Sequence, residues 1–253
     1  MARYQIILVY DGTGFFGSQR QGGSRTVQSE LEKALRKIGW SGRTVYLAGR
    51  TDTGTHASGQ VAAFDLDWGH GPEKLQDALN AHLPADMAVR AARLAEEDFH
   101  PRFDATSRSY RYRLFCAGVR DPLRERYAWR VWPAVKGLGS LAGYWPGTHD
   151  FTAFGSPTHA GGSTIRTVVS ADWQLQGDEW TFTIQANAFL YRMVRRLVAA
   201  QVAVGQGRLA AEVLARALDE RTEVRQQAQG QIPKGLAPAS GLTLVAVCYD
   251  DLD

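Results

Sequence analysis

The sequence predicts an α+β protein built from two tandem ferredoxin-like units, each with the element order βαββαβ. Strand-type and helix-type hydrophobic periodicities alternate in that order along the first half, and the same order recurs along the second half. The 253 residues, 44% of them hydrophobic, suffice for the core of one large or two small domains. We therefore expect domains over residues 1–105 and 106–253, with a mixed or antiparallel sheet and helices on one face.

The first half contains each element of one unit. Residues 3–10 are rich in Ile, Val and Tyr and predict a strand. A helix over residues 27–39 follows from its apolar stripe, from Thr26 as an N-cap and from Gly39 as a stop signal. The remaining elements are two strands, a helix and a strand, over residues 44–49, 60–66, from Pro72 onward, and 87–94.

The second half repeats this order with weaker signals. Residues 109–115 predict a strand, and residues 133–145 predict a helix that glycines interrupt. A hairpin follows, with its turn in the sequence QGDE. The later elements are two helices and a closing strand, over residues 189–204, 209–228 and 242–249.

Arginine outnumbers lysine 24 to 5, although the formal net charge is only +3. Eight arginines and only three acidic residues lie between residues 102 and 130. Because a guanidinium group matches the geometry of phosphate, this density predicts a surface for a polyanion. A genome rich in GC codons is an equally good explanation of the overall arginine content. A sheet face rich in Arg and Tyr is a plausible platform for nucleic acid.

Cysteine usage and hydropathy indicate a cytoplasmic protein. Cys116 and Cys248 are the only cysteines, and each lies within an apolar stretch, so we expect two buried free thiols. No apolar run approaches the ~18 residues that a membrane span requires, and the N-terminal segment does not have the pattern of a signal peptide.

The stretch AGRTDTGTHASGQ, residues 48–60, contains the main candidate for chemistry. Arg50 and Asp52 lie on a loop of roughly ten residues between two predicted strands, which is longer than a usual hairpin connection. An exposed ion pair would contribute little. A desolvated aspartate beside an arginine would instead stay ionised and could act as a nucleophile. For His56, on the same loop, we expect a structural role.

Three other groups of residues are weaker candidates. Strand alternation places Arg108, Tyr110 and Tyr112 on one face, where an aromatic ring could stack on a base or pack half-buried in the sheet. A helix carries three arginines, of which one could reach a buried carboxylate: Arg192, Arg195 and Arg196. The pair His149–Asp150 is similar to the signature of HD phosphohydrolases, but further metal ligands are not evident.

Seven motifs in a fixed order closely resemble the TruA family of tRNA pseudouridine synthases over nearly the whole chain. They are YDGTGFFGSQRQ (10–21), AGRTDTGTHASGQVAAF (48–64), ALNAHLP (78–84), FHPRFDATSRSYRY (99–112), GTHDFTAF (147–154), FLYRMVR (189–195) and APASGLTL (237–244). The chain departs from the family pattern at Ser18 (usually Trp), Thr53 (Ala), Thr55 (Val), Pro101 (Ala) and Ala199 (Gly).

The resemblance implies a role for each of five residues. Asp52 is the catalytic aspartate, Arg50 its companion and Tyr110 the ring that stacks on the target base. Arg195 pairs with the aspartate, and Leu242 lines the pocket. It also implies a homodimer without cofactor or metal that isomerises uridine at positions 38–40 of tRNA. The aspartate loop lies in the first domain, and the second is expected to complete the cleft.

Two alternatives stay open at this point. A non-catalytic RNA-binding protein on a duplicated ferredoxin-like fold explains the Arg and Tyr residues but leaves the aspartate loop unused. A metal-dependent phosphohydrolase around His149 and Asp150 requires a metal ion. Within the leading hypothesis, Asp52 could attack the ribose, attack the base or abstract a sugar proton.

Overall fold

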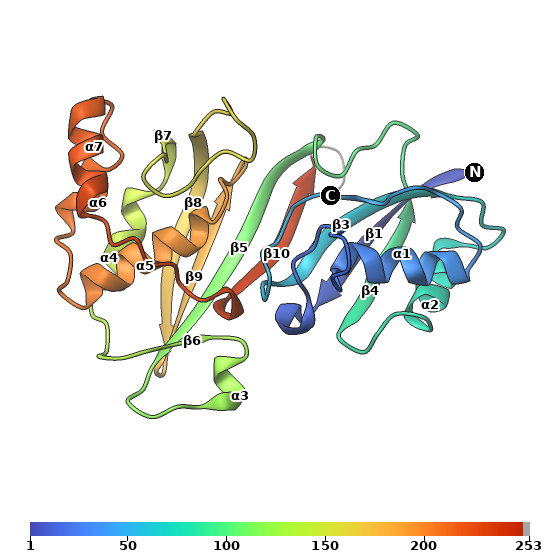
Figure 1. Ribbon diagram of the computed structural model, residues 1–253, viewed down its shortest axis with the longest axis horizontal. Coiled ribbons are helices and arrows are strands. Elements are labelled where there is room, and N and C mark those ends of the chain that lie inside the picture. Colours follow the sequence, from blue (N-terminus) through green and yellow to red (C-terminus); the bar gives the residue numbers. More distant parts are fainter. Residues whose placement is uncertain (250–253) are drawn as a thin grey trace. The chain divides into compact units, whose positions relative to one another are not determined.

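The computed structural model describes residues 1–249, which form two compact units (Figure 1). Within the described residues, the first unit comprises Met1–Thr106 and residues 243–249, and the second comprises Ser107–Leu242. The sequence assigned the final strand to the second domain. The structure groups it with the first because Thr243 and Leu244 pair in parallel with the start of a first-unit strand.

The elements of the first unit follow the predicted order. They are β1 (Ala2–Tyr10), η1 (Gly12–Gly14), α1 (Val27–Lys37), β2 (Tyr46–Leu47), β3 (His56–Leu66), α2 (Pro72–Asn80) and β4 (Met87–Leu94). Strand β1 lies between β4 and β3 and is antiparallel to both. Strand β2 pairs antiparallel with the second half of β3, and β10 (Leu242–Tyr249) pairs with its first two residues.

Both helices of the first unit cover one face of its sheet (Figure 1). Alternate β1 residues are buried, as the strand period requires: Tyr4, Ile6, Leu8 and Tyr10. The helices bury their apolar stripes, which include Leu31, Leu35, Leu75 and Leu79. Thr26 caps α1 as predicted, because its hydroxyl accepts the Ser29 N–H while the Ser29 hydroxyl accepts the Thr26 N–H.

The second unit has more elements than the sequence predicts. They are β5 (Ala105–Cys116), α3 (Pro122–Glu125), β6 (Trp129–Val131), α4 (Leu138–Leu141), η2 (Ala142–Tyr144), β7 (Gly147–Asp150), β8 (Ile165–Gln176), β9 (Glu179–Ala186), α5 (Met193–Gly205), α6 (Glu212–Arg216), α7 (Thr222–Gln231) and η3 (Ala239–Gly241). The strand order is β5-β9-β8-β7, antiparallel throughout, with β6 parallel to β5. The predicted hairpin is β8–β9.

Three helix predictions in this unit need correction. The helix expected over 133–145 shrinks to α4 and η2, because the glycines along this segment oppose a longer helix. The helix expected over 209–228 is split into α6 and α7, where Asp219 accepts the Arg221 N–H and competes with the helical hydrogen bonds. Helix α5 begins four residues later than predicted, after Arg192 in the left-handed region at φ 62°.

The α+β class is confirmed, since α-helices accompany strands whose pairings are mostly antiparallel. The duplication of a βαββαβ unit stays a prediction. Both cysteines are free, but the expectation of two buried thiols is wrong: Cys116 is half-buried and Cys248 is exposed. Within residues 1–249, no helix is long and apolar enough to cross a membrane.

Candidate functional site

The loop that carries Asp52 connects β2 to β3 in the first unit. The Arg50 side chain is exposed, whereas Asp52 is half-buried between a buried Thr51 and an exposed Thr53. Directly after Asp52 the chain turns: the Thr55 N–H donates to the Asp52 carbonyl at 3.0 Å, and Gly54 adopts φ 80°. A glycine suits that left-handed position, so the turn fits the sequence TDTGT.

The loop rests directly on the backbone of residues 12–18. The Ser18 N–H donates to the Thr51 carbonyl at 3.1 Å, and the Thr51 N–H donates to Ser18 Oγ at 2.9 Å. A side chain on Gly12 would overlap the Thr55 carbonyl, and one on Gly17, at φ 81°, would lie 2.9 Å from the Thr51 carbonyl oxygen. Gly12 and Gly17 therefore allow the two backbone segments to touch.

Buried polar side chains of β1 and β3 hold the first part of the loop. Gln60, which is 0% exposed, accepts the Gly49 N–H at 3.2 Å and donates to the Gly49 carbonyl at 2.8 Å. The Tyr10 hydroxyl lies 2.9 Å from Thr51 Oγ1, and both residues are buried. Gly49 and Thr51 flank Arg50, so the backbone on either side of this arginine is held.

His56 has the structural role that its sequence position favours. It is 5% exposed, and its Nδ1 accepts the Gly12 N–H at 3.0 Å. The same nitrogen lies 3.2 Å from Asp11 Oδ1. The ring therefore ties the start of β3 to the turn after β1, beneath the aspartate loop.

The other three predicted residues lie in the second unit. The Tyr110 ring packs edge-to-face on Phe189, with ring centroids 5.0 Å apart. Arg195, in the first turn of α5, donates from Nε to the Ala237 carbonyl at 2.8 Å. Leu242 is buried in the hydrophobic core of this unit. Arg195 therefore contacts the first residue of the short segment 237–242, and Leu242 is its last residue.

Tyr112 supports the same segment from β5. It is 0% exposed, and its hydroxyl donates to the Pro238 carbonyl at 2.8 Å. Burial raises the pKa of Tyr112 well above its usual value, and the charge of Arg195 partly opposes this shift. The Tyr112 ring leaves no room for a side chain on Gly241. The alternation predicted for residues 108–113 is confirmed for Tyr110 and Tyr112, which both pack against this core.

The arginine-rich segment 102–130 is less basic than its sequence predicts. Several of its arginines form salt bridges: Arg113 with Glu179, Arg124 with Asp178, and Arg120 and Arg130 with Glu125. Asp178 and Glu179 lie outside the counted segment, at the turn between β8 and β9. The local excess of positive charge therefore does not by itself define a surface for a polyanion.

Of the three arginines predicted on one helix, Arg192 lies just before α5, and Arg195 and Arg196 lie within it. Arg192 precedes the helix and lies over the Tyr191 ring, with its guanidinium carbon 4.6 Å from the ring centroid. The prediction that the helix carries Arg192 is therefore wrong, whereas Arg195 and Arg196 lie in its first turns.

In the part of the chain that the structure describes, the pair His149–Asp150 has no metal-site geometry. Asp150 pairs with Arg225 at 3.1 Å and accepts the Thr152 N–H. Among residues 1–249 no group of three potential metal-binding side chains occurs, so the phosphohydrolase alternative gains no support.

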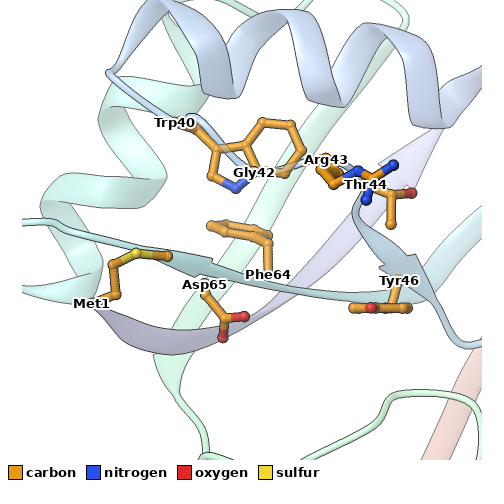
Figure 2. A pocket seen from close by; sticks show the side chains of 8 residues that line it. All are labelled: Met1, Trp40, Gly42, Arg43, Thr44, Tyr46, Phe64 and Asp65. Atoms are coloured by element: carbon orange, nitrogen blue, oxygen red, sulfur yellow. The ribbon is translucent and has the colours of Figure 1, made fainter.

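A cavity of about 160 Å³ lies elsewhere in the first unit, at the edge of β3 (Figure 2). Trp40 lies above Phe64 in this view, and Tyr46 and Asp65 also line the cavity. The Asp65 carboxylate is occupied by Arg3, with Nε–Oδ1 at 2.8 Å. Residues 48–55 do not line this cavity, so it does not mark the aspartate loop.

Comparison with known proteins agrees with the sequence motifs. A family profile described as tRNA pseudouridine synthase matches residues 6–104 and 142–250. The chain belongs to the tRNA pseudouridine synthase family. Members of this family are isomerases, and the enzyme class expected from the sequence is therefore confirmed.

Three relatives named tRNA pseudouridine synthase A illustrate how far the similarity extends. The protein of Methylacidiphilum infernorum is 41% identical, and the alignment covers 97% of this chain and 95% of the relative. The Chloroflexus aurantiacus protein is 40% identical over 98% of this chain and 89% of the relative. The Limosilactobacillus fermentum protein is 38% identical over 99% and 97%, respectively. The similarity to pseudouridine synthases thus includes both units.

The sequence patterns did not identify three buried side chains that contact the aspartate loop: Tyr10, Ser18 and Gln60. One signal was present: Gln60 occupies a β3 position whose alternation with Ala62 and Phe64 predicts an interior side chain. Ser18 was recognised only as a departure from the family pattern.

Proposed function

We propose that this pseudouridine synthase converts uridine to pseudouridine at positions 38–40 of the tRNA anticodon stem-loop, with Asp52 as the catalytic carboxylate. The observation that carries the proposal is the placement of Asp52 on a loop fixed by buried partners within the sequence matched by the family. A carboxylate held in one position is suited to attack a bound substrate.

The reaction rearranges one nucleotide. The bond between ribose C1′ and uracil N1 breaks, the base rotates, and a bond forms between C1′ and uracil C5, which gives up its proton. The N1 left behind gains a proton, so atoms balance without a second substrate. A carboxylate can serve this chemistry without metal or cofactor. Attack on the ribose, attack on the base and abstraction of a sugar proton all use the same anionic group.

The target base must leave its stack before it can react. Extrusion of a nucleotide costs a few kcal/mol, and stacking on an aromatic ring returns roughly 1–3 kcal/mol per base. We assign this stacking to Tyr110, whose ring is half-buried and supported by Phe189. Leu242 is assigned an apolar contact with the base, and Arg195 the pairing with Asp52 that the TruA resemblance implies.

Binding of tRNA is assigned to exposed arginines rather than to all of the arginine-rich segment. Arg50 is exposed beside Asp52, and Arg111 is exposed on β5. Guanidinium contacts with phosphate position an RNA without reading its sequence, which suits an enzyme that acts on three neighbouring nucleotides. We further propose a homodimer that works in the cytoplasm, because the TruA resemblance implies the dimer and tRNA is a cytoplasmic substrate.

Mapping pseudouridine in an unmodified tRNA transcript tests this function. The transcript carries uridine at positions 38–40 and is incubated with the protein, then treated with carbodiimide and reverse-transcribed. We expect stops that report pseudouridine at these positions, and none in a matched transcript with cytidine there. Addition of a chelator should leave the yield unchanged. Tight binding without any new pseudouridine would favour the non-catalytic RNA-binding alternative.

A further inference from the structure

Ser18 uses each of its backbone and side-chain polar groups to connect the aspartate loop to helix α1. Its N–H donates to the Thr51 carbonyl at 3.1 Å, and its Oγ accepts the Thr51 N–H at 2.9 Å. Its carbonyl accepts the Gln28 N–H, in the first turn of α1, at 2.9 Å. Ser18 is 0% exposed, so water does not replace these bonds.

These contacts fix the two peptide planes that precede the Asp52 side chain. The Thr51 N–H belongs to the peptide unit between Arg50 and Thr51, and the Thr51 carbonyl belongs to the unit between Thr51 and Asp52. Because each peptide unit is planar, one hydrogen bond to each restrains the dihedral angles between them. The Asp52 carboxylate is then separated from a fixed peptide plane only by the φ angle of Asp52 and by its side-chain torsions.

Two further side chains act on the same stretch. Tyr10 contacts the Thr51 hydroxyl at 2.9 Å, and Gln60 holds Gly49 through both atoms of its amide. On the C-terminal side, the Asp52 carbonyl accepts the Thr55 N–H. Hydrogen bonds therefore hold the chain before and after Asp52, and the Ser18 contacts are those nearest to it before the carboxylate.

We propose that Ser18 is a positioning residue for catalysis, which holds Thr51 so that the Asp52 carboxylate points at the reacting nucleotide. This inference rests on the proposed function. It assigns Ser18 an effect on the rate of the chemical step and none on the binding of tRNA. Tyr10 has a weaker effect of the same kind, because it restrains only the Thr51 side chain.

The test compares Ser18→Ala with wild type in single-turnover reactions on an unmodified tRNA transcript, with enzyme in excess. Ser18→Ala keeps the backbone bond to the Thr51 carbonyl but removes the acceptor for the Thr51 N–H. A displacement of about 1 Å can cost about 100-fold in rate, so we expect a fall of about 10- to 100-fold. The dissociation constant for tRNA, measured by filter binding, should stay within about three-fold, because phosphate contacts are unaffected.

Two further variants separate positioning from general weakening of the fold. Asn80→Leu removes two side chain–backbone bonds, to the Val89 N–H and carbonyl, on α2 and β4 of the same unit. It should leave the single-turnover rate unchanged. Tyr10→Phe removes one hydroxyl while keeping the ring, and should lower the rate less than Ser18→Ala does. Amide exchange at Thr51 should be faster in Ser18→Ala than in wild type.

The outcomes are distinct. If Ser18→Ala lowers the melting temperature but reacts at the wild-type rate, Ser18 is structural and this inference is wrong while the proposed function stands. An equal fall in rate for Ser18→Ala and Asn80→Leu would also overturn it. If wild type forms no pseudouridine on a transcript that it binds, the proposed function fails, and the inference fails with it.

Discussion

The buried amide of Gln60 provides a quantitative test of how the aspartate loop is held. Gln60→Met keeps the length of an unbranched side chain but leaves the Gly49 N–H and carbonyl without their partner. An unsatisfied buried polar group costs about 1–3 kcal/mol, and Gly49 is only half-buried, so we take the lower end for each group. Burial of the apolar methionine offsets part of this. The expected loss is about 1–3 kcal/mol.

Calorimetry measures this loss directly. For a protein of this size, 1 kcal/mol corresponds to about 2–4 °C, so the melting temperature should fall by about 2–12 °C. Gln76→Met is the matched control, because it is the same substitution at a glutamine that donates to the Arg90 carbonyl at 3.0 Å. Arg90 is exposed, so water replaces that bond and the expected change is about 0–1 kcal/mol.

Two results would contradict this prediction. If Gln60→Met melts within about 1 °C of wild type, or if Gln76→Met lowers the melting temperature as much as Gln60→Met does, burial does not determine these hydrogen-bond contributions. The loop would then be held by its backbone contacts with residues 12–18 rather than by the amide.

Three other predictions follow from individual contacts. Thr55 is 2% exposed and its hydroxyl has no partner within residues 1–249, so Thr55→Val should leave the free energy of unfolding unchanged or raise it by up to about 1 kcal/mol. A clearly lower melting temperature would contradict this. Gly12→Ala would overlap the Thr55 carbonyl, so it should displace the loop and lower both stability and pseudouridine formation, whereas an active variant of wild-type stability would show that the contact can relax. The hydrogen bond from Arg221 lowers the pKa of Asp219 to about 2. The ionised carboxylate therefore stabilises the folded protein above pH 3.8, the unfolded pKa, and this stabilisation is lost as pH falls through about 2. A carboxyl NMR titration should show this midpoint and its rise in Arg221→Ala; an unchanged midpoint would exclude the pair as its cause.

The first unit could be predicted from sequence because its signals are local. The alternation of Tyr4, Ile6 and Leu8 and the apolar stripe of α1 depend only on neighbouring residues. The start of α5 could not be predicted in this way. Arg192 adopts φ 62° next to Tyr191, which pairs with Ser156 far away in the sequence. A hydrophobic pattern contains no information about such a pairing.

Charge counting failed for a related reason. The excess of arginine in residues 102–130 is a property of one segment, but the salt-bridge partners Asp178 and Glu179 come from the β8–β9 turn. The pairing of Arg113 with Thr181 across β5 and β9 brings that turn alongside. Surface charge therefore depends on strand register, which the sequence predicts only in part.

In the candidate site, too, local signals were predictable from the sequence and contacts between distant residues were not. Asp52 was identified from its motif and the length of its loop, both of which are visible in a short stretch. Its supports were not, because Ser18 lies 33 residues before its partner Thr51, and Tyr10 lies 41 residues before it. A serine that accepts a backbone N–H has no pattern that distinguishes it from an exposed serine.

The catalytic role of Asp52 is tested most directly by Asp52→Asn, which keeps the size of the side chain and removes its charge. Pseudouridine formation on the anticodon stem-loop is measured in a single turnover, together with the dissociation constant for tRNA. We expect that pseudouridine is no longer formed while the dissociation constant stays within about three-fold of wild type, since phosphate contacts provide the binding. Turnover at the wild-type rate would show that the reaction does not need the Asp52 carboxylate.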